Sequence, residues 1–127
     1  MYPLSMSDRA RFGVCPEPTL KLQFADGHRR QVELNRFVRF EADSNYTNCI
    51  FQDGSRLLVS ITLGQLLTRI SPTEYIRIHS KHAINRQYVA GVIPGKQVVR
   101  LITGEDVVIA RRRMREILAE LPALSFD

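Results

Sequence analysis

The strongest constraint on the fold of this chain is a succession of short segments in which apolar and polar residues alternate, separated by turn residues. Alternation with a period of two is the pattern of a strand that buries one face. Residues 19–34 alternate on both sides of Asp26-Gly27, and Asp53-Gly54 separates two later segments, as expected for tight hairpin turns. Further strands are predicted at 37–41, 46–52, 57–61, 75–79, 89–93, 97–102 and 107–110. The expected fold is mainly β, with antiparallel sheets.

Two short helices are expected to accompany the strands. Thr62 can cap a helix over 63–70, where leucine and isoleucine recur at helical spacing before Pro72. A final helix is predicted at about 112–121, again with an apolar stripe, and Pro122 ends it.

The length and apolar content predict one domain with a real core, because 44% of the 127 residues are hydrophobic. Residues 1–18 lack periodicity and contain prolines, so we expect a flexible N-terminal leader or linker there. The hairpin at 19–34 is interpreted as an accessory unit. The main domain is expected at 35–122, followed by a C-terminal tail at 123–127.

The charge balance favours a polyanionic partner. Eighteen Lys and Arg against thirteen Asp and Glu give a formal charge of +5. Cys15 and Cys49 have neither metal-ligand spacing nor the density of a disulfide scaffold, which suggests a reducing, cytoplasmic location. The sequence has no apolar run of about eighteen residues and no apolar N-terminal signal region, so no membrane association is predicted.

Polar or basic clusters stand at the ends of three β-like segments. They are Asn45-Tyr46-Thr47-Asn48, His79-Ser80-Lys81-His82 and Arg111-Arg112-Arg113. Three adjacent guanidinium groups repel one another unless water or an anion surrounds them, and the positive end of a helix dipole adds to the repulsion. A solvated helix start is the alternative to phosphate contact. Arginine can also donate two hydrogen bonds to guanine in the major groove. We therefore predict that the clusters contact nucleic acid.

The cluster at 79–82 has other readings. His79 and His82 would point to opposite faces of a strand and no further ligand is near, so no metal site or other cofactor is predicted. No Gly-x-Ser-x-Gly motif occurs, and no enzymatic activity is expected. Two interpretations of residues 79–82 remain open, a solvated loop and a loop that faces DNA. His79 is expected on the face opposite to Ile76 and Ile78.

The clusters and the segments between them resemble the LytTR DNA-binding domain of bacterial response regulators and transcription factors, over roughly residues 34–121. The family's apolar strand ending in Glu-Ala, two variable residues and Asn-Tyr-Thr is found at 40–47. Its Arg-x-His motif, followed by an apolar-Asn pair, is found at 77–79 and 83–85. A late strand running into arginine is found at 107–111.

This chain departs from the family pattern at three places. Ser44 stands where the family usually has glycine, Ser80-Lys81 stands where it usually has Arg-Ser, and Ala110 replaces a serine. Lys81 can supply the charge of the missing arginine one residue later.

The resemblance implies an elongated fold of mainly antiparallel β-sheets with short helices, whose loops enter successive major grooves. The implied DNA-contacting residues are Asn45, Tyr46, Thr47, Asn48, His79, Ser80, Lys81, Arg111, Arg112 and Arg113. Asn85 matches the motif too, but an asparagine ending a strand can equally satisfy backbone groups.

The leading hypothesis is a sequence-specific regulator of transcription that binds double-stranded DNA as a homodimer. Family members usually carry a sensor before this module, and residues 1–18 are too short for one. An upstream sensor protein, a stand-alone regulator and a fragment therefore all remain open. One alternative is a protein-interaction module with the 19–34 hairpin as docking edge. Another is a single-stranded nucleic-acid binder, which would need exposed aromatic residues, and the chain has no Trp.

Overall fold

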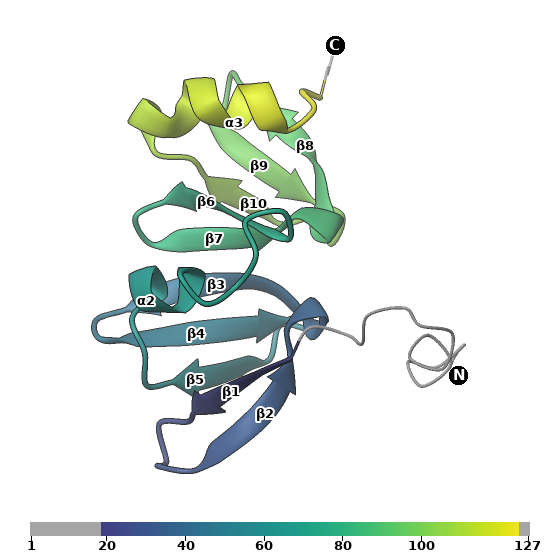
Figure 1. The fold of residues 1–127 in the computed structure, drawn as a ribbon. Helices are drawn as coiled ribbons and strands as arrows, with labels where there is room; N and C mark the ends of the chain where they lie inside the picture. The colour runs from purple at the N-terminus through teal and green to yellow at the C-terminus, as the bar shows by residue number, and fades with distance from the viewer. Residues whose placement is uncertain (1–18, 125–127) are drawn as a thin grey trace, which may run out of the picture.

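Three antiparallel sheets follow one another along the molecule in the computed structural model, which describes residues 19–124 (Figure 1). The leader expected at 1–18 and the end of the tail, 125–127, lie outside the described residues. The hairpin consists of β1 (Thr19–Gln23) and β2 (Arg29–Glu33). The central sheet has the order β5-β4-β3-β7-β6, and the third sheet has the order β10-β9-β8. This is the expected mainly β fold.

The central sheet contains β3 (Phe37–Asp43), β4 (Tyr46–Phe51), β5 (Arg56–Val59), β6 (Tyr75–His79) and β7 (His82–Asn85). The third sheet contains β8 (Val89–Ile93), β9 (Val98–Leu101) and β10 (Asp106–Val108). The helices are α2 (Leu63–Leu67) and α3 (Met114–Glu120), and short 3-10 turns occur at η1 (Leu34–Arg36), η2 (Arg86–Tyr88) and η3 (Arg111–Arg113).

Most predicted strands are present, with two differences in the polar clusters. Sequence analysis did not separate β7 from the preceding cluster, because it is only four residues long and begins with His82. The final helix was expected from about residue 112. Instead, Arg111–Arg113 form the 3-10 turn η3 and α3 begins at Met114.

One face of the central sheet is covered along all five strands, and the other face is covered over β3, β6 and β7. One face packs on the hairpin and α2, forming a first core that includes Phe40 and Tyr75. The other face packs on the third sheet and α3, forming a second core that includes Ile76 and Ile78. Tyr75 lies on the face opposite to Ile76 and Ile78, yet it is 4% exposed and its hydroxyl donates to the Leu34 carbonyl. A strand between two layers has no solvent face.

Local capping explains where α2 begins. The Gln65 amide donates to the Thr62 hydroxyl at 3.2 Å, and the Gln65 side chain accepts from the Thr62 amide at 3.4 Å. This reciprocal capping box satisfies two amides that the first helical turn leaves without partners. The helix ends earlier than the expected residue 70, because the Thr68 and Arg69 amides donate to carbonyls three residues back, those of Gln65 at 3.2 Å and Leu66 at 3.0 Å, and the last turn tightens.

The segment after α3 adds to the edge of the third sheet. The Val92 amide donates to the Pro122 carbonyl at 2.8 Å, and the Leu124 amide donates to the Val92 carbonyl at 2.7 Å. Gly91 lies beneath this segment. A Cβ at that position would lie 2.4 Å from Cγ of Leu124 and 3.0 Å from the Pro122 carbonyl oxygen.

We predict that Gly91→Ala lowers the free energy of unfolding by about 1–3 kcal/mol, because the added methyl group would displace Leu124 from β8. Urea denaturation would measure the change. Gly95→Ala is the matched control, since a Cβ at Gly95 meets no atom within 4 Å. Equal stability of the two variants would show that the C-terminal segment is not held as described.

Candidate nucleic-acid interface

Two backbone hydrogen bonds bring the three clusters to one end of the strands. The Ala42 amide donates to the Lys81 carbonyl at 2.8 Å, which joins the end of β3 to the β6–β7 turn. The Ala110 amide donates to the Ile78 carbonyl, also at 2.8 Å, which places η3 beside the end of β6. The β3–β4 turn, the β6–β7 turn and η3 consequently share the left-hand side of the molecule in Figure 1.

The β3–β4 turn contains the first cluster. Ser44 adopts a φ of +57°, the left-handed region that favours glycine, which explains why a glycine suits this family position. Asn45 and Tyr46 are exposed, with Tyr46 39% exposed. Thr47 is fully buried, and its hydroxyl donates to the Ile61 carbonyl at 2.7 Å. Its side chain therefore anchors the strand below the turn and offers no surface to a partner. Asn48 is half-buried within β4.

The β6–β7 turn contains the second cluster. Ser80 and Lys81 are exposed, whereas His79 is half-buried. The Lys81 amide donates to Nδ1 of His79 at 3.1 Å. Because Nδ1 accepts, the neutral imidazole carries its proton on Nε2, and that nitrogen remains a donor for a ligand.

Arg77 holds this turn from behind, a role that sequence analysis missed. Its guanidinium donates to the carbonyls of His79 at 3.3 Å and Ser80 at 2.7 Å. Burial lowers the pKa of Arg77, and the nearby charge of Arg113 lowers it further. The hydrogen bond from the Ala110 amide to the Ile78 carbonyl brings the second and third clusters side by side. The Arg-x-His spacing was the available signal, although nothing in it indicated which backbone groups the arginine would bind.

The two histidines of the cluster face the same side, contrary to the sequence argument. His79 and His82 are cross-strand partners, with ring centroids 5.4 Å apart, because the chain reverses between them. The described residues contain no group of three or more His, Cys, Asp or Glu residues that could hold a metal ion. His82 is half-buried and its Nδ1 has no hydrogen-bond partner within residues 19–124.

The three arginines of the third cluster differ in their exposure to solvent. Arg111 and Arg112 are exposed, whereas Arg113 is half-buried and lies 3.9 Å from Glu116. Within residues 19–124, no side-chain hydrogen bond caps the N-terminus of η3 or of α3. The first two guanidinium groups are thus available to an anion, and the third is partly committed to the fold.

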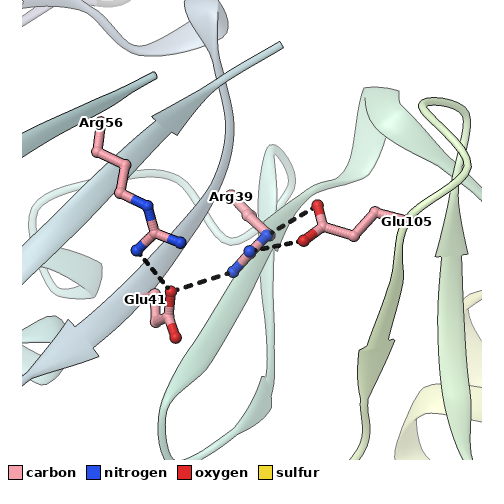
Figure 2. Close-up of polar contacts among 4 residues, drawn as sticks. All are labelled: Arg39, Glu41, Arg56 and Glu105. Atoms are coloured by element: carbon pink, nitrogen blue, oxygen red, sulfur yellow. Dashed lines mark hydrogen bonds and ion pairs between the residues drawn. The ribbon is translucent and has the colours of Figure 1, made fainter. Parts of the chain in front are cut away.

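Four charged residues form a separate network between the central and third sheets (Figure 2). Arg39 donates to both carboxylate oxygens of Glu105, at 3.1 and 2.7 Å, although its side chain is only 8% exposed. Oε1 of Glu41 lies 3.6 Å from Nη1 of Arg39 and 3.1 Å from Nη1 of Arg56. These arginines are occupied within the fold, on a face of the sheet rather than at its turns.

Asn85 and Cys49, which the sequence analysis also considered, are both buried within the fold. Asn85 is 1% exposed, donates to the Phe37 carbonyl at 3.0 Å and accepts from the Gln87 amide at 2.9 Å. Cys49 is fully buried, and desolvation raises its pKa to about 12, so its thiol stays protonated at neutral pH. Asn85 therefore satisfies backbone groups, the second of the two roles considered for it.

The fold and the clustered turns are those of a known class of DNA-binding domain. The chain belongs to the LytTr DNA-binding domain family, whose model matches residues 28–121. The match begins in the β1–β2 turn and ends after α3. This membership confirms the resemblance drawn from the motifs, and the family is one of regulatory domains rather than enzymes.

Particular relatives are two heme-containing CO-sensing transcriptional regulators, RcoM 1 and RcoM 2, of Paraburkholderia xenovorans strain LB400. The chain is 27% identical to RcoM 1 and 26% identical to RcoM 2 over 90 residues. Each alignment covers 68% of this chain and 33% of the relative, so the match spans a third of those proteins.

A solved structure has the same fold. It is the LytTr DNA-binding domain of a putative methyl-accepting/DNA response regulator from Bacillus cereus, with a TM-score of 0.63 and 17% identity. The similarity covers 79% of this chain and 95% of that one. Among the described residues, no helix has the length and apolar character needed to span a membrane.

The position of His82 predicts a loss of stability in acid. Burial lowers its pKa, and the nearby charge of Arg39 adds to the effect. The unfolded chain therefore binds this proton first as the pH falls. The stability contributed by neutral His82 is present above about pH 6.5 and is lost as the pH falls through the lower, folded-state pKa.

We expect His82→Asn to show a smaller fall in the free energy of unfolding between pH 7.5 and pH 5 than the wild type. Denaturant titrations at several pH values would measure it. His28→Asn serves as the control, because the His28 side chain is 69% exposed. An identical pH dependence in wild type and His82→Asn would contradict the assignment.

Proposed function

We propose that this chain recognises specific sequences in duplex DNA and is the DNA-binding part of a transcriptional regulator. The observation that carries the proposal is the gathering of exposed polar and basic side chains, from three separate parts of the sequence, at one end of the strands. These side chains are Asn45, Tyr46, Ser80, Lys81, Arg111 and Arg112. Family membership and the names of the relatives support the same function.

Each cluster would contribute a different kind of contact. Arg111 and Arg112 can donate paired hydrogen bonds to guanine O6 and N7, whereas Lys81 suits a phosphate. Asn45 can pair with an adenine edge, and Nε2 of His79 can donate to a base or phosphate. Among the residues first predicted at the interface, Thr47 and Asn48 lie below the first turn, and Arg113 is half-buried; their role in this proposal is to hold the contacting residues in place.

Duplex DNA fits better than a single strand. Binding single strands uses aromatic platforms on which bases stack. The large apolar side chains exposed in residues 19–124 include one aromatic ring, that of Tyr46. We therefore favour contacts in the grooves and to the backbone over stacking.

The proposed regulator includes a sensor as well as this DNA-binding module. The relatives are about three times as long as the matched segment, so we propose that a sensor acts together with this module, in the same polypeptide or in a separate protein. Binding would take place in the cytoplasm and would involve no catalysis.

We predict that Arg112→Ala weakens binding to the preferred duplex by about 1–3 kcal/mol and relaxes preference at one base pair, as loss of a bidentate guanine contact should. Fluorescence anisotropy on a duplex enriched by selection with this protein would measure it, with random duplex for comparison. Equal losses on both duplexes would make Arg112 a phosphate contact.

Lys81→Ala should weaken binding to all duplexes alike and should make the slope of log K against log salt shallower by about one unit, because one phosphate contact is lost. Arg36→Ala is the control, since Arg36 is exposed at the opposite end of β3. An unchanged slope for Lys81→Ala would remove this residue from the interface.

We expect two protomers on paired sites about 10 bp, or a multiple of it, apart, since one small module buries only about 600–1,000 Å² on DNA. Inserting about half a helical turn between the sites should abolish cooperative binding, and a full turn should partly restore it. Gel-shift titrations would show this. Full affinity of a lone monomer for a single site would contradict it.

A further inference from the structure

The tip of the β1–β2 hairpin lies at the same end of the strands as the three clusters. Phe24 pairs with Val59, and Val59 pairs with Thr47. Thr47 pairs with Ala42, whose amide binds the Lys81 carbonyl. On the other side, the Phe24 amide donates to the His28 carbonyl at 2.7 Å. One row of six backbone neighbours therefore runs from Lys81 in the β6–β7 turn, through β3, β4 and β5, to Phe24 and His28 in the hairpin.

This row is long on the scale of a DNA site. Neighbouring strands lie about 4.8 Å apart, so the five steps from Lys81 to His28 span about 24 Å. That distance corresponds to about seven base pairs at 3.4 Å each. The hairpin tip would thus meet the duplex about seven base pairs away from the part that the β6–β7 turn contacts. Figure 1 shows the tip of the hairpin on the same side as the β3–β4 turn.

The hairpin tip is basic. His28, Arg29 and Arg30 are all exposed, and Asp26 is the single acidic residue of the turn. The Arg30 guanidinium carbon lies 5.5 Å from the centre of the Phe24 ring, which is itself packed against the first core. A cation held over an aromatic ring loses less freedom when it binds an anion.

The hairpin is also attached firmly enough to act with the rest of the interface. The Ala25 amide donates to the Leu58 carbonyl at 3.0 Å, and the Ser60 amide donates to the Gln23 carbonyl at 2.7 Å. Leu22 is buried in the first core with 1% exposure. The tip therefore keeps its place relative to β5 and the neighbouring turns.

We propose that the β1–β2 turn is a fourth DNA contact, in which Arg29 and Arg30 bind backbone phosphates that flank the sequence read by the three clusters. The inference rests on the proposed function. Within the described residues β2 pairs only with β1, so its outer edge could instead receive a strand from a protein partner. Exposed charged side chains on an edge strand disfavour such pairing, and they suit phosphates.

The test compares wild type with Arg29→Gln/Arg30→Gln by fluorescence anisotropy over a range of salt concentrations. The probe is a selected duplex with flanks of about 10 bp, and the same duplex with its flanks removed. On the long duplex we expect at least a roughly tenfold loss of affinity at 0.1 M salt and a slope shallower by about two units, one for each lost phosphate contact. On the trimmed duplex the two proteins should bind alike.

Controls separate charge from folding. Arg29→Gln alone leaves the contact of Arg30 with Phe24 in place and should make the slope of log K against log salt shallower by about one unit. Arg29→Lys keeps the charge and should show the wild-type slope. Arg36→Gln removes the same charge at the far end of β3 and should have little effect. Thermal melting by circular dichroism should be the same for all of these variants.

Failure of the inference differs from failure of the proposed function. If the double variant binds the long duplex as wild type does, while Lys81→Ala still shows a shallower slope, the hairpin is not a DNA contact and the proposed function stands. If wild type binds no duplex, the proposed function fails and the inference with it. Loss of self-association in the double variant, with DNA affinity unchanged, would make the hairpin an interface between copies of this chain.

Discussion

The whole fold depends on the burial of the central sheet between two cores, which covers one face along all five strands and the other face over β3, β6 and β7. In β3, Phe40 is fully buried in the first core, while the adjacent Arg39 is 7% exposed beneath the third sheet. Where the second face stays open, beside β4 and β5, Arg56 is paired with Glu41. The exposed residues of the three clusters lie in the turns and in η3, and the backbone bonds from Ala42 to Lys81 and from Ala110 to Ile78 hold these segments side by side. The two cores thereby fix the geometry of the proposed interface, although none of their side chains would touch DNA.

Burial also divides the basic residues into two groups. A guanidinium between two sheets is tolerated only when its donors are satisfied, and the paired hydrogen bonds of Arg39 to Glu105 meet that requirement. Arg86 is similarly paired with Glu120 at 2.5 Å. Lys81 and Arg112, by contrast, are exposed at the clustered turns. The net charge of +5 is therefore less informative than the position of each cation relative to the strand ends.

Local signals predicted the fold well, because they act within a few residues. The hairpin turn at Asp26-Gly27 forms as expected, with Gly27 at a φ of +94°. Contacts between residues that are distant in the sequence could not be predicted from it. The burial of Thr47 depends on the Ile61 carbonyl, and the pairing of His79 with His82 depends on a reversal within a short polar run. Sequence therefore identified the clusters, whereas only the tertiary structure shows which of their side chains face solvent.

The central claim is that turns, and not a helix, meet the DNA. Hydrogen–deuterium exchange with and without a bound duplex tests it most directly, because each amide reports on its own surroundings. We expect slower exchange on DNA binding at residues 44–46, 79–81 and 111–112, with α3 and the β4–β5 turn unchanged. Protection centred on α3, with those three segments unaffected, would show that a helix enters the groove and would contradict the account.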